Sequence, residues 1–484
     1  MTNSIKNELK DIPSFHPVVI IGGGIVGSGI FRELSLHQVG CLLIDKFDFS
    51  SQTSQSSSKM LHGGIRYLEN MDFSLVWEAL KEKNRWLEIA PHLCYPKHFS
   101  MPVYKESSRP LWMIHAGVFL YDILSGFKNM PHKRTNKEQT LEEHPYLRDQ
   151  GLKGAGVYSD AIVDDAKMTL ECIYDGLKER DSYACNYTSL VKAERKKDSH
   201  NKELYFLTMK DEITGQTREM VCEHLVFATG PFTDRLLKDL NLFSWTPKLI
   251  LSKGSHLWFS KEDFPLENPV VLTPDDGRVI FVIPQGNKVL VGTTEKAATS
   301  EFNQEASQEE IEYLLNNLRE YFPKAQLAQE HIMASFAGLR PLVREDEGSD
   351  LGKVARHHKI YQPQDHAYVI LGGKYTTFRV MASDLVKILF SQMKKTYHPE
   401  LSLTPFRQKS TYLPWKPIDL DRQKLKTILD RECPKTFEDL ILRRMGVWNL
   451  EEAPHIREFL KENESLWLPK LRVPEDWAQI IKDN

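Results

Sequence analysis

The clearest pattern near the start of the chain is an apolar, mostly β-branched run at positions 17–21 that ends in a cluster of glycines. After the glycines, apolar residues recur at the spacing of a helix, and a second apolar run, Gly40 to Ile44, follows. Short apolar runs bounded by turn residues are typical of buried strands. The pattern therefore predicts a strand, a tight turn, a helix and a second strand, which is how an α/β fold begins.

Two later regions predict other kinds of structure. Val270 to Thr294 alternates β-rich runs with the turn sequences PDDG and PQGN, which predicts an antiparallel sheet. From about residue 418 onward, apolar residues recur at helical intervals among balanced charges. A small C-terminal helical domain is the expectation for that part of the chain.

The segment Leu111 to Leu124 (LWMIHAGVFLYDIL) is the most apolar stretch. It is shorter than the roughly 20 apolar residues that cross a bilayer, and it contains His115 and Asp122. Lys105 and Arg109 precede it, so it is a candidate for an amphipathic helix on a membrane surface. A helix in the core of a domain is the alternative, and the sequence leaves both open.

Composition limits the classes of protein that fit. The length of 484 residues predicts two to four structural units at about 100–200 residues each. With 41% hydrophobic and 27% charged residues, the chain is globular rather than disordered or a coiled coil. The net charge of −3, with no long basic block, argues against nucleic acid as a partner. Six scattered cysteines lack zinc-ligand spacing, so we expect no protein metal site and a cytoplasmic location.

The glycine cluster has a specific spacing. Gly22, Gly24 and Gly27 form G-x-G-x-x-G, which allows a tight turn, close approach of a pyrophosphate, and close packing of helix on strand. Asp45 ends the second strand, 18 residues after Gly27, where a carboxylate that binds ribose is expected. Together they predict a dinucleotide site, and the fingerprint alone leaves both NAD and FAD open.

Further motifs follow in order along the chain. They are the Ser/Thr-rich stretch and HGGIRY within residues 48–69, VDDA (163–166), FATGP (227–231), KGSH (253–256), VIP (282–284), VGTTE (291–295), GLRPL (338–342) and LGGKYTTFR (371–379). This series resembles the aerobic-type, quinone-linked, FAD-dependent glycerol-3-phosphate dehydrogenases of the glycine-oxidase-like (D-amino-acid-oxidase) superfamily. The resemblance runs from residue 17 to about 390 and weakens thereafter. One departure is Asp45, where bacterial members commonly have Glu.

The resemblance implies a fold and an activity. The fold is α/β, with a Rossmann-like FAD-binding domain built from discontinuous segments, an antiparallel-sheet cap that binds substrate, and a small C-terminal helical domain. The expected segments are 14–76, 155–240 and 330–395 for the FAD domain, 77–154 and 241–329 for the cap, and 400–484 for the helical domain. The implied reaction is oxidation of sn-glycerol 3-phosphate to dihydroxyacetone phosphate, with hydride transfer from C2 to FAD N5 and electrons passed to membrane quinone.

The resemblance also assigns residues around the cofactor. By composition alone, the Ser/Thr-rich stretch 50–58 is typical of a flexible linker; the resemblance makes it a loop around the flavin. In addition to Gly22, Gly24, Gly27 and Asp45, the implied FAD contacts are Thr53, Ser54, Ser58, His62, Gly64, Gly230, Gly373, Lys374 and Thr376. Thr377 is the expected N-cap of the helix that follows, and the positive end of that helix would stabilise a reduced flavin.

The substrate carries a phosphate dianion, so its site needs cations, and Arg pairs phosphate oxygens through a planar fork. The resemblance assigns substrate binding to Arg66, Tyr67, His256, Arg340 and Lys374. Removal of the C2 hydroxyl proton requires a base suited to neutral pH, for which His is well matched. His256 is the first choice as catalytic base and His62 the alternative, with Arg340 and Lys374 as further catalytic residues.

The implied partners are glycerol 3-phosphate, a quinone and a membrane surface, with the protein peripheral on the cytoplasmic face of the inner (plasma) membrane. A homodimer is an open expectation. The closest competing function is an oxidase that passes electrons to oxygen and makes hydrogen peroxide. A non-catalytic flavoprotein is disfavoured by the joint presence of Arg66, His256, Arg340 and Lys374. An amine oxidase is disfavoured because clustered cations repel an ammonium group.

Overall fold

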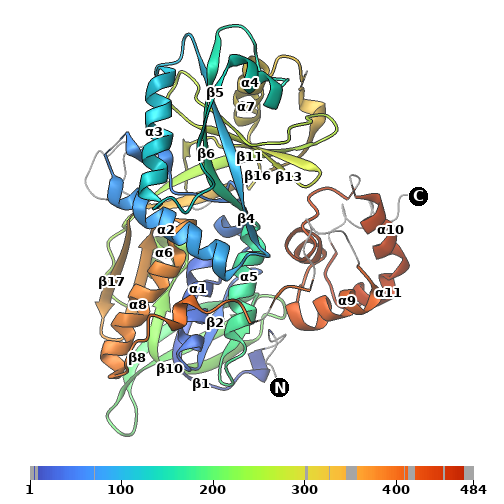
Figure 1. Cartoon of the computed structure of the whole chain (residues 1–484). Helices are drawn as coiled ribbons and strands as arrows, with labels where there is room; N and C mark the ends of the chain where they lie inside the picture. The colour runs from blue at the N-terminus through green and yellow to red at the C-terminus, as the bar shows by residue number, and fades with distance from the viewer. Residues whose placement is uncertain are drawn as a thin grey trace. The chain divides into compact units, whose positions relative to one another are not determined.

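The computed structural model describes residues 5, 9–69, 71–299, 304–325, 327–344, 357–407, 409–411, 420–450 and 453–473. The chain divides into two compact units, coloured by residue number in Figure 1. Unit 1 comprises Met1–Gln55, Asp165–Leu251 and Arg340–Asn484, and unit 2 comprises Ser56–Asp164 and Ser252–Leu339.

Unit 1 is built on a mainly parallel sheet. Its strands run in the order β17-β18-β10-β1-β2-β7, with β8 and β9 added through antiparallel pairing to β10. β1 pairs in parallel with both β2 and β10. The strands are β1 (Phe15–Ile21), β2 (Cys41–Ile44), β7 (Tyr183–Cys185), β8 (Thr188–Lys197), β9 (Glu203–Asp211), β10 (Thr217–Phe227), β17 (His358–Gln364) and β18 (Ala367–Gly372).

Helices cover one face of this sheet. The helix α1 (Ile25–Leu36) packs against both α5 (Asp165–Gly176) and α8 (Phe378–Met393). Their apolar side chains form one buried cluster with Val18, Ile20 and neighbouring strand residues. The alternate residues Val19 and Ile21 belong to a second buried cluster with β9 and β10. Successive side chains of a strand point to opposite faces, so β1 is buried on both sides, as its continuous apolar run predicts.

Unit 2 contains a mainly antiparallel sheet with strands in the order β15-β11-β14-β13-β12-β4-β6-β3. β16 pairs with β11 and β5 pairs with β6. The strands are β3 (Met60–Leu61), β4 (Cys94–Tyr104), β5 (Lys133–Asn136), β6 (Leu152–Val163), β11 (Leu249–Ser260), β12 (Val270–Leu272), β13 (Ile280–Gln285), β14 (Lys288–Gly292), β15 (Lys296–Ala297) and β16 (Ile332–Val343). The antiparallel sheet predicted for Val270 to Thr294 is confirmed as β12, β13 and β14.

The helices of unit 2 are α2 (Phe73–Ile89), α3 (Leu111–Leu124), α4 (Lys137–Glu143) and α7 (Gln308–Tyr321). α3 occupies the segment predicted to be helical, and only Val118, Tyr121 and Asp122 are buried in it. α3 is therefore a surface helix packed on β6, not a fully buried core helix. Across the described residues, we find no helix with the length and apolar character needed to cross a membrane.

The C-terminal part of unit 1 is helical, as predicted. It contains α9 (Arg422–Thr427), the π-helical turns η9 (Ile428–Glu432) and η10 (Asp439–Arg444), α10 (Pro454–Glu462) and α11 (Glu464–Trp467). Thirteen buried apolar residues, from Leu425 to Leu471, form their own cluster. This C-terminal helical region (residues 420–473) is grouped with unit 1 although it has a core of its own.

The division differs in detail from the predicted segments. Residues 56–76, expected with the FAD domain, group with unit 2, and residues 400–484 group with unit 1, while the division into three domains stays a prediction. The strand, turn and helix order at the N-terminus and the α/β fold class agree with the sequence interpretation.

Candidate cofactor-binding and catalytic site

The glycine-rich turn joins β1 to α1 in a geometry that excludes side chains. Gly22 has φ +104°, and a Cβ there would lie 2.5 Å from the carbonyl oxygen of Ala228. A Cβ on Gly27 would lie 1.8 Å from the carbonyl oxygen of Gly22. The first and third glycines of the motif are therefore required by close backbone approach, as the spacing predicts.

Ser54 lies at the start of α1. Its Oγ accepts a hydrogen bond from the backbone N–H of Ile25 at 2.8 Å, while the N-cap residue Gly24 has no side chain to do so. Ser54 belongs to the short helix η2 (Thr53–Gln55), 29 residues along the chain from Ile25. The Ser/Thr-rich stretch is thus folded against the glycine-rich turn at this point.

Asp45 lies where the fingerprint predicts a ribose ligand. Its two carboxylate oxygens accept hydrogen bonds from the backbone N–H groups of Gly23 (2.7 Å) and Phe47 (2.8 Å). Burial raises the pKa of Asp45 to about 7, against the opposing effect of these two donors. Asp45 as a whole residue is of intermediate exposure, beside the glycine-rich turn.

Two buried hydroxyls lie next to this turn. The backbone N–H of Ser50 donates to the carbonyl oxygen of Gly23 at 3.1 Å. The Oγ atoms of Ser50 and Ser51 are buried, and within the described part of the chain neither has a hydrogen-bond partner. Buried polar atoms are nearly always paired. The two hydroxyls lie near a turn without side chains, and Asp45 stands at the sequence position where a ribose-binding carboxylate is expected. The residues present therefore fit a bound dinucleotide.

The other predicted cofactor residues of unit 1 lie at two strand-to-helix turns. Gly230 begins η4 (Gly230–Phe232) after β10, and no described atom lies within 4 Å of the Cβ it lacks. Gly373 and Lys374 follow β18, and Thr376 is buried in η7 (Tyr375–Thr377). Thr377 takes the predicted N-cap position of α8, but its hydroxyl donates to the carbonyl oxygen of Lys374 at 3.3 Å rather than capping the helix.

In unit 2, His256 lies on one face of the sheet together with its paired residues. His256 on β11 pairs with Gly292 on β14, which in turn pairs with Phe281 on β13. A Cβ on Gly292 would lie 2.1 Å from the His256 ring, so the absent side chain makes room for that ring. The second candidate, His62, follows β3, and its ring centroid lies 6.4 Å from that of Phe281. Directly paired residues share a face of a sheet.

The His256 ring is fixed by its neighbours. It is 1% exposed. Its Nε2 lies 2.9 Å from Ser58 Oγ, and its plane stacks on Phe336 at 4.9 Å between centroids. The structure therefore brings together Ser58 and His256, which the sequence assigned separately to cofactor and substrate.

Two lysines lie near the aromatic rings of Phe336 and Trp258. Lys59 Nζ lies 5.3 Å from the ring centroid of Phe336, and Lys288 Nζ lies 5.2 Å from that of Trp258. Burial lowers the pKa of Lys288 to about 8, and the charge of Lys59 lowers it further. The sequence interpretation missed Lys59, Lys288 and Phe336; the position of Lys59 directly after Ser58 was the available signal for one of them.

The remaining predicted substrate residues lie on separate elements. Gly64 precedes η3 (Ile65–Leu68), which carries Arg66 and Tyr67 in contact with each other; the guanidinium lies 5.2 Å from the tyrosine ring centroid. Arg340 is half-buried near the end of β16, just after Leu339, where that strand passes from unit 2 to unit 1, and unit 1 also contains Lys374. The predicted site residues thus divide between the two units, and their shared role in one site stays a prediction.

A parallel sheet whose first strand and helix enclose a side-chain-free G-x-G-x-x-G turn, with an acidic residue after the second strand, defines a dinucleotide-binding α/β protein. The family model for DAO, the FAD dependent oxidoreductases, matches residues 17–377. The chain therefore belongs to the DAO family of FAD dependent oxidoreductases, and FAD is its cofactor.

Individual relatives agree with this assignment. The chain is 33% identical over 396 residues to the aerobic glycerol-3-phosphate dehydrogenase of Staphylococcus saprophyticus, covering 81% of this chain and 70% of the relative. The glycerol-3-phosphate dehydrogenase of Bacillus halodurans complexed with FAD has a similar fold, with a TM-score of 0.72 at 24% identity over 96% of this chain and 92% of that one. The L-alpha-glycerophosphate oxidase of Mycoplasma pneumoniae with FAD bound has a TM-score of 0.61 at 17% identity, covering 81% and 98% of the two chains.

Proposed function

We propose that this chain oxidises sn-glycerol 3-phosphate to dihydroxyacetone phosphate and passes the electrons to a membrane quinone. The observation that carries the proposal is the 33% identity, over 81% of the chain, to a protein named aerobic glycerol-3-phosphate dehydrogenase. Bound FAD supplies the two-electron acceptor that the oxidation of an alcohol requires.

The phosphate of the substrate is assigned to three cations, Arg66, Arg340 and Lys374. A dianion in a partly buried site needs opposite charge, and an arginine fork binds two phosphate oxygens at once. All three residues are of intermediate exposure, although the Nζ atom of Lys374 is itself buried.

His256 is assigned as the base that takes the proton from the C2 hydroxyl as the C2–H bond breaks. Its ring is buried and held in one orientation by Ser58, Phe336 and the backbone of Gly292. His62, whose ring centroid lies 6.4 Å from that of Phe281, is the alternative. The rate of flavin bleaching in a single turnover separates them: His256→Asn is expected to lower this rate by about 10²–10⁴-fold, and His62→Asn by much less. The reverse order would transfer the role to His62.

The reaction itself is tested by adding sn-glycerol 3-phosphate anaerobically to the purified holoprotein. We expect the visible band of the oxidised flavin to bleach, and a quinone analogue to restore it faster than oxygen does. A flavin that stays oxidised contradicts the proposed substrate. Reoxidation by oxygen with one hydrogen peroxide formed per substrate would instead establish the competing oxidase activity, the function in the name of the Mycoplasma pneumoniae protein.

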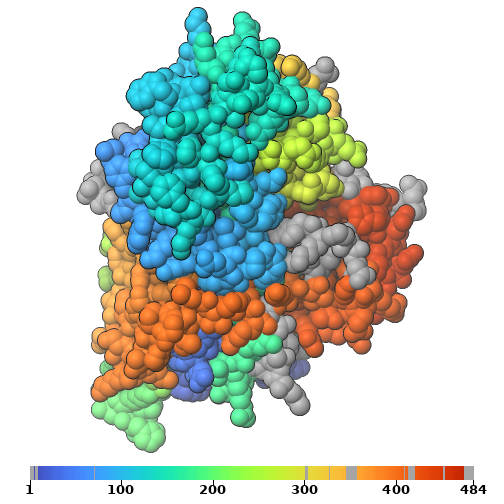
Figure 2. All heavy atoms as spheres, in the orientation of Figure 1, coloured from blue at the N-terminus to red at the C-terminus, as the bar shows by residue number. Residues whose placement is uncertain are grey.

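Transfer to quinone requires contact with a membrane, and we assign this to α3 and its neighbour α2, on the cytoplasmic face of the inner membrane. On α3 the side chains of Trp112 and Phe119 are 68% and 42% exposed, and on α2 Trp77 is 51% exposed. The cyan atoms of the α3 segment lie on the face of the molecule seen in Figure 2. Exposed aromatic side chains on a surface helix are typical of interfacial membrane binding.

Sedimentation with vesicles that contain anionic phospholipid tests the membrane assignment. The double variant Trp112→Ser/Phe119→Ser is expected to lose vesicle binding while it keeps turnover with a soluble dye. Phe15→Ser is the control, because Phe15 is 46% exposed but belongs to unit 1. Unchanged vesicle binding by the double variant would contradict docking through α3.

A further inference from the structure

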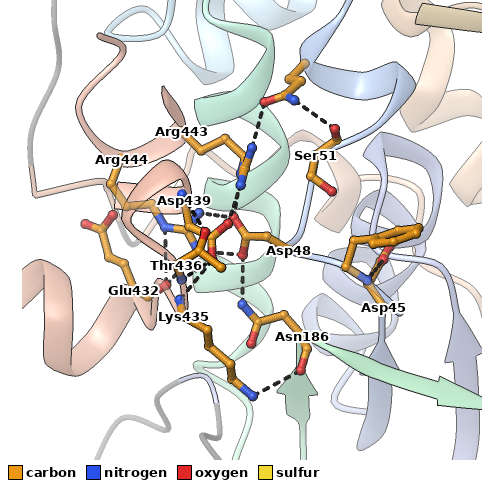
Figure 3. A network of polar contacts seen from close by, with 12 residues as sticks. Asp45, Asp48, Ser51, Asn186, Glu432, Lys435, Thr436, Asp439, Arg443 and Arg444 are labelled. Carbon is orange, nitrogen blue, oxygen red and sulfur yellow. Dashed lines mark hydrogen bonds and ion pairs between the residues drawn. The ribbon is translucent and has the colours of Figure 1, made fainter. Parts of the chain in front are cut away.

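A buried polar network connects residues 48–55, here called the cofactor loop, to the C-terminal helical region (Figure 3). The cofactor loop contains Ser54, which caps α1, and the two buried hydroxyls of Ser50 and Ser51. The C-terminal helical region lies outside residues 17–377, the part that matches the family model.

Asp48, at the start of the cofactor loop, is the centre of the network. Its Oδ2 accepts from Arg443 Nε at 2.6 Å and from Arg444 Nη1 at 2.5 Å. Its Oδ1 accepts from Arg444 Nη2 at 3.0 Å and from Asn186 Nδ2 at 2.7 Å. Asp48, Arg443 and Arg444 are 1%, 3% and 0% exposed. Two arginines thus contact one carboxylate out of reach of solvent.

Arg443 contacts both ends of the cofactor loop. While its Nε donates to Asp48, its Nη1 donates to Gln55 Oε1 at 3.1 Å. Gln55 in turn contacts the middle of the loop, because its backbone N–H donates to the carbonyl oxygen of Ser50 at 3.0 Å and its Nε2 to that of Ser51 at 2.7 Å. A single guanidinium therefore links the first and last residues of the loop.

The network is balanced in charge. Arg443 also pairs with Asp439, so two carboxylates face two guanidiniums. Burial alone would raise the pKa of Asp48, but the charges of Arg444 and Arg443 lower it to about 2. The carboxylate is therefore ionised at neutral pH, and these are charge-assisted hydrogen bonds, which are stronger and more directional than neutral ones.

Stability alone does not account for this arrangement. A buried ion pair usually gains little over apolar packing, because two charges lose their hydration. The C-terminal helical region has apolar packing of its own in the cluster from Leu425 to Leu471. What the arginines add is a defined position for the residues that they contact.

We propose that Arg443 and Arg444 are positioning residues for FAD, which fix the cofactor loop against the glycine-rich turn through Asp48 and Gln55. Without them, the backbone from Ser50 to Ser54 has several arrangements in place of one. Free FAD must then select the competent arrangement, which weakens its apparent affinity in proportion to the fraction that is competent. This role of the C-terminal helical region concerns the cofactor alone and does not depend on which substrate is oxidised.

The test is FAD binding to the apoprotein, measured by quenching of flavin fluorescence and by the visible spectrum of the bound flavin. Arg443→Met is expected to raise the Kd for FAD by at least about tenfold, because it removes charge-assisted hydrogen bonds at both ends of the loop. Arg443→Lys keeps the charge but lacks the fork, and its Kd is expected to lie between those of the parent and Arg443→Met.

Gln55→Met keeps the test valid if Arg443→Met fails to fold, because it cuts the bridge without changing any charge. A rise in Kd of about three- to tenfold is expected from the loss of its hydrogen bonds. Arg407→Gln is the matched control: Arg407 pairs with buried Asp175 on α5, at 3.0 Å, and within the described ranges it makes no hydrogen bond or ion pair with the cofactor loop. Its Kd is expected to stay within about twofold of the parent value.

Two results would overturn the proposal. One is a Kd and a flavin spectrum that are unchanged in Gln55→Met and in folded Arg443→Lys. The other is an equal loss of affinity in Arg407→Gln, which would reduce the network to general support of the fold. Neither readout requires glycerol 3-phosphate, so failure here is distinct from failure of the proposed activity.

Discussion

Two segments that the sequence assigns to the cofactor are each held by a buried carboxylate, but the pKa values of the two carboxylates differ. The Asp48 cluster (Asp48, Asp439, Arg443 and Arg444) supports residues 48–55 in unit 1. The Asp160 cluster (Lys83, Tyr121 and Asp160) supports the His62–Gly64 segment in unit 2. In it, Asp160 Oδ1 accepts from Tyr121 Oη at 2.9 Å and from the Gly63 N–H at 3.3 Å.

Both carboxylates are about equally buried, yet their pKa values move in opposite directions. Burial raises the pKa of Asp160 to about 6, and the charge of Lys83 opposes this only in part. Lys83 Nζ lies 3.6 Å from the carboxylate and also donates to Asn129 Oδ1 and to the carbonyl oxygen of Ser159. Asp48 has two guanidiniums in hydrogen-bond contact, and its pKa falls to about 2. The comparison shows that the geometry and number of the cationic partners, rather than burial, decide whether an interior carboxylate stays charged.

The largest effect is expected from Arg444→Met, which breaks the charge balance of the Asp48 cluster. Asp48 cannot readily take up a proton there, so an uncompensated charge stays buried. We expect the free energy of unfolding in urea to fall by about 3–5 kcal/mol. Arg235→Met is the control, because Arg235 and Asp239 are 57% and 65% exposed and their pair contributes about 0–1 kcal/mol. If Arg444→Met lowered the free energy of unfolding by less than about 1 kcal/mol, the Asp48 cluster would be no more sensitive than a surface ion pair.

Lys83→Met breaks the Asp160 cluster with a smaller expected cost. Asp160 already has a pKa of about 6, so when Lys83 is removed the carboxylate can bind a proton and become neutral. We expect the free energy of unfolding to fall by about 1–2 kcal/mol at pH 7. The loss should shrink below pH 6, where the carboxyl is neutral in both proteins. Lys81→Met, an exposed position on the same helix, is the control. An equal loss of unfolding free energy at pH 5 and pH 7 would show that protonation of Asp160 does not reduce the cost of removing Lys83.

The smallest effect is expected in how steeply the free energy of unfolding changes with pH. The folded pKa of Asp160 is raised above its ordinary value of 3.8, so the folded state binds more protons than the unfolded state between about pH 4 and 6. Asp160 therefore makes the protein less stable as the pH rises through this window. Asp160→Asn should remove that contribution, which is at most about 1.4 kcal/mol per pH unit.

The Asp48 cluster should behave in the opposite way at lower pH. Its folded pKa lies below 3.8, so its contribution is present above about pH 4 and is lost as the pH falls toward 2. Urea unfolding of parent and Asp160→Asn from pH 3 to 7 measures both trends. Parallel curves for the two proteins between pH 4 and 6 would contradict the raised pKa of Asp160.

The sequence predicted the local parts of this structure well. β1, the glycine-rich turn, α1 and β2 follow from residues within about 30 positions of each other, and α3 occupies the expected Leu111–Leu124. Such elements depend on periodicity and on backbone geometry that each residue carries with it. The same holds for Gly22 and Gly27, where only one residue type avoids a clash.

The sequence did not predict the contacts between the cofactor loop and the C-terminal helical region. Asp48 and Arg443 are 395 positions apart, and neither has a local signal that names its partner. Arginines in a helical segment are usually solvated, so the Arg443–Arg444 pair had no distinguishing feature. The face shared by His256, Gly292 and Phe281 was likewise hidden, because strand register depends on pairing between segments.

The distance between Asp48 and Arg443 along the chain also orders events during synthesis. A ribosome adds about 5–20 residues per second, so roughly 20–80 s pass between the emergence of the acidic residue and that of the arginines it contacts. During this interval the nascent Rossmann-type segment has its glycine-rich turn but not the guanidiniums of Arg443 and Arg444 beside it. On the role proposed for Arg443 and Arg444, tight binding of FAD waits until both arginines have left the ribosome.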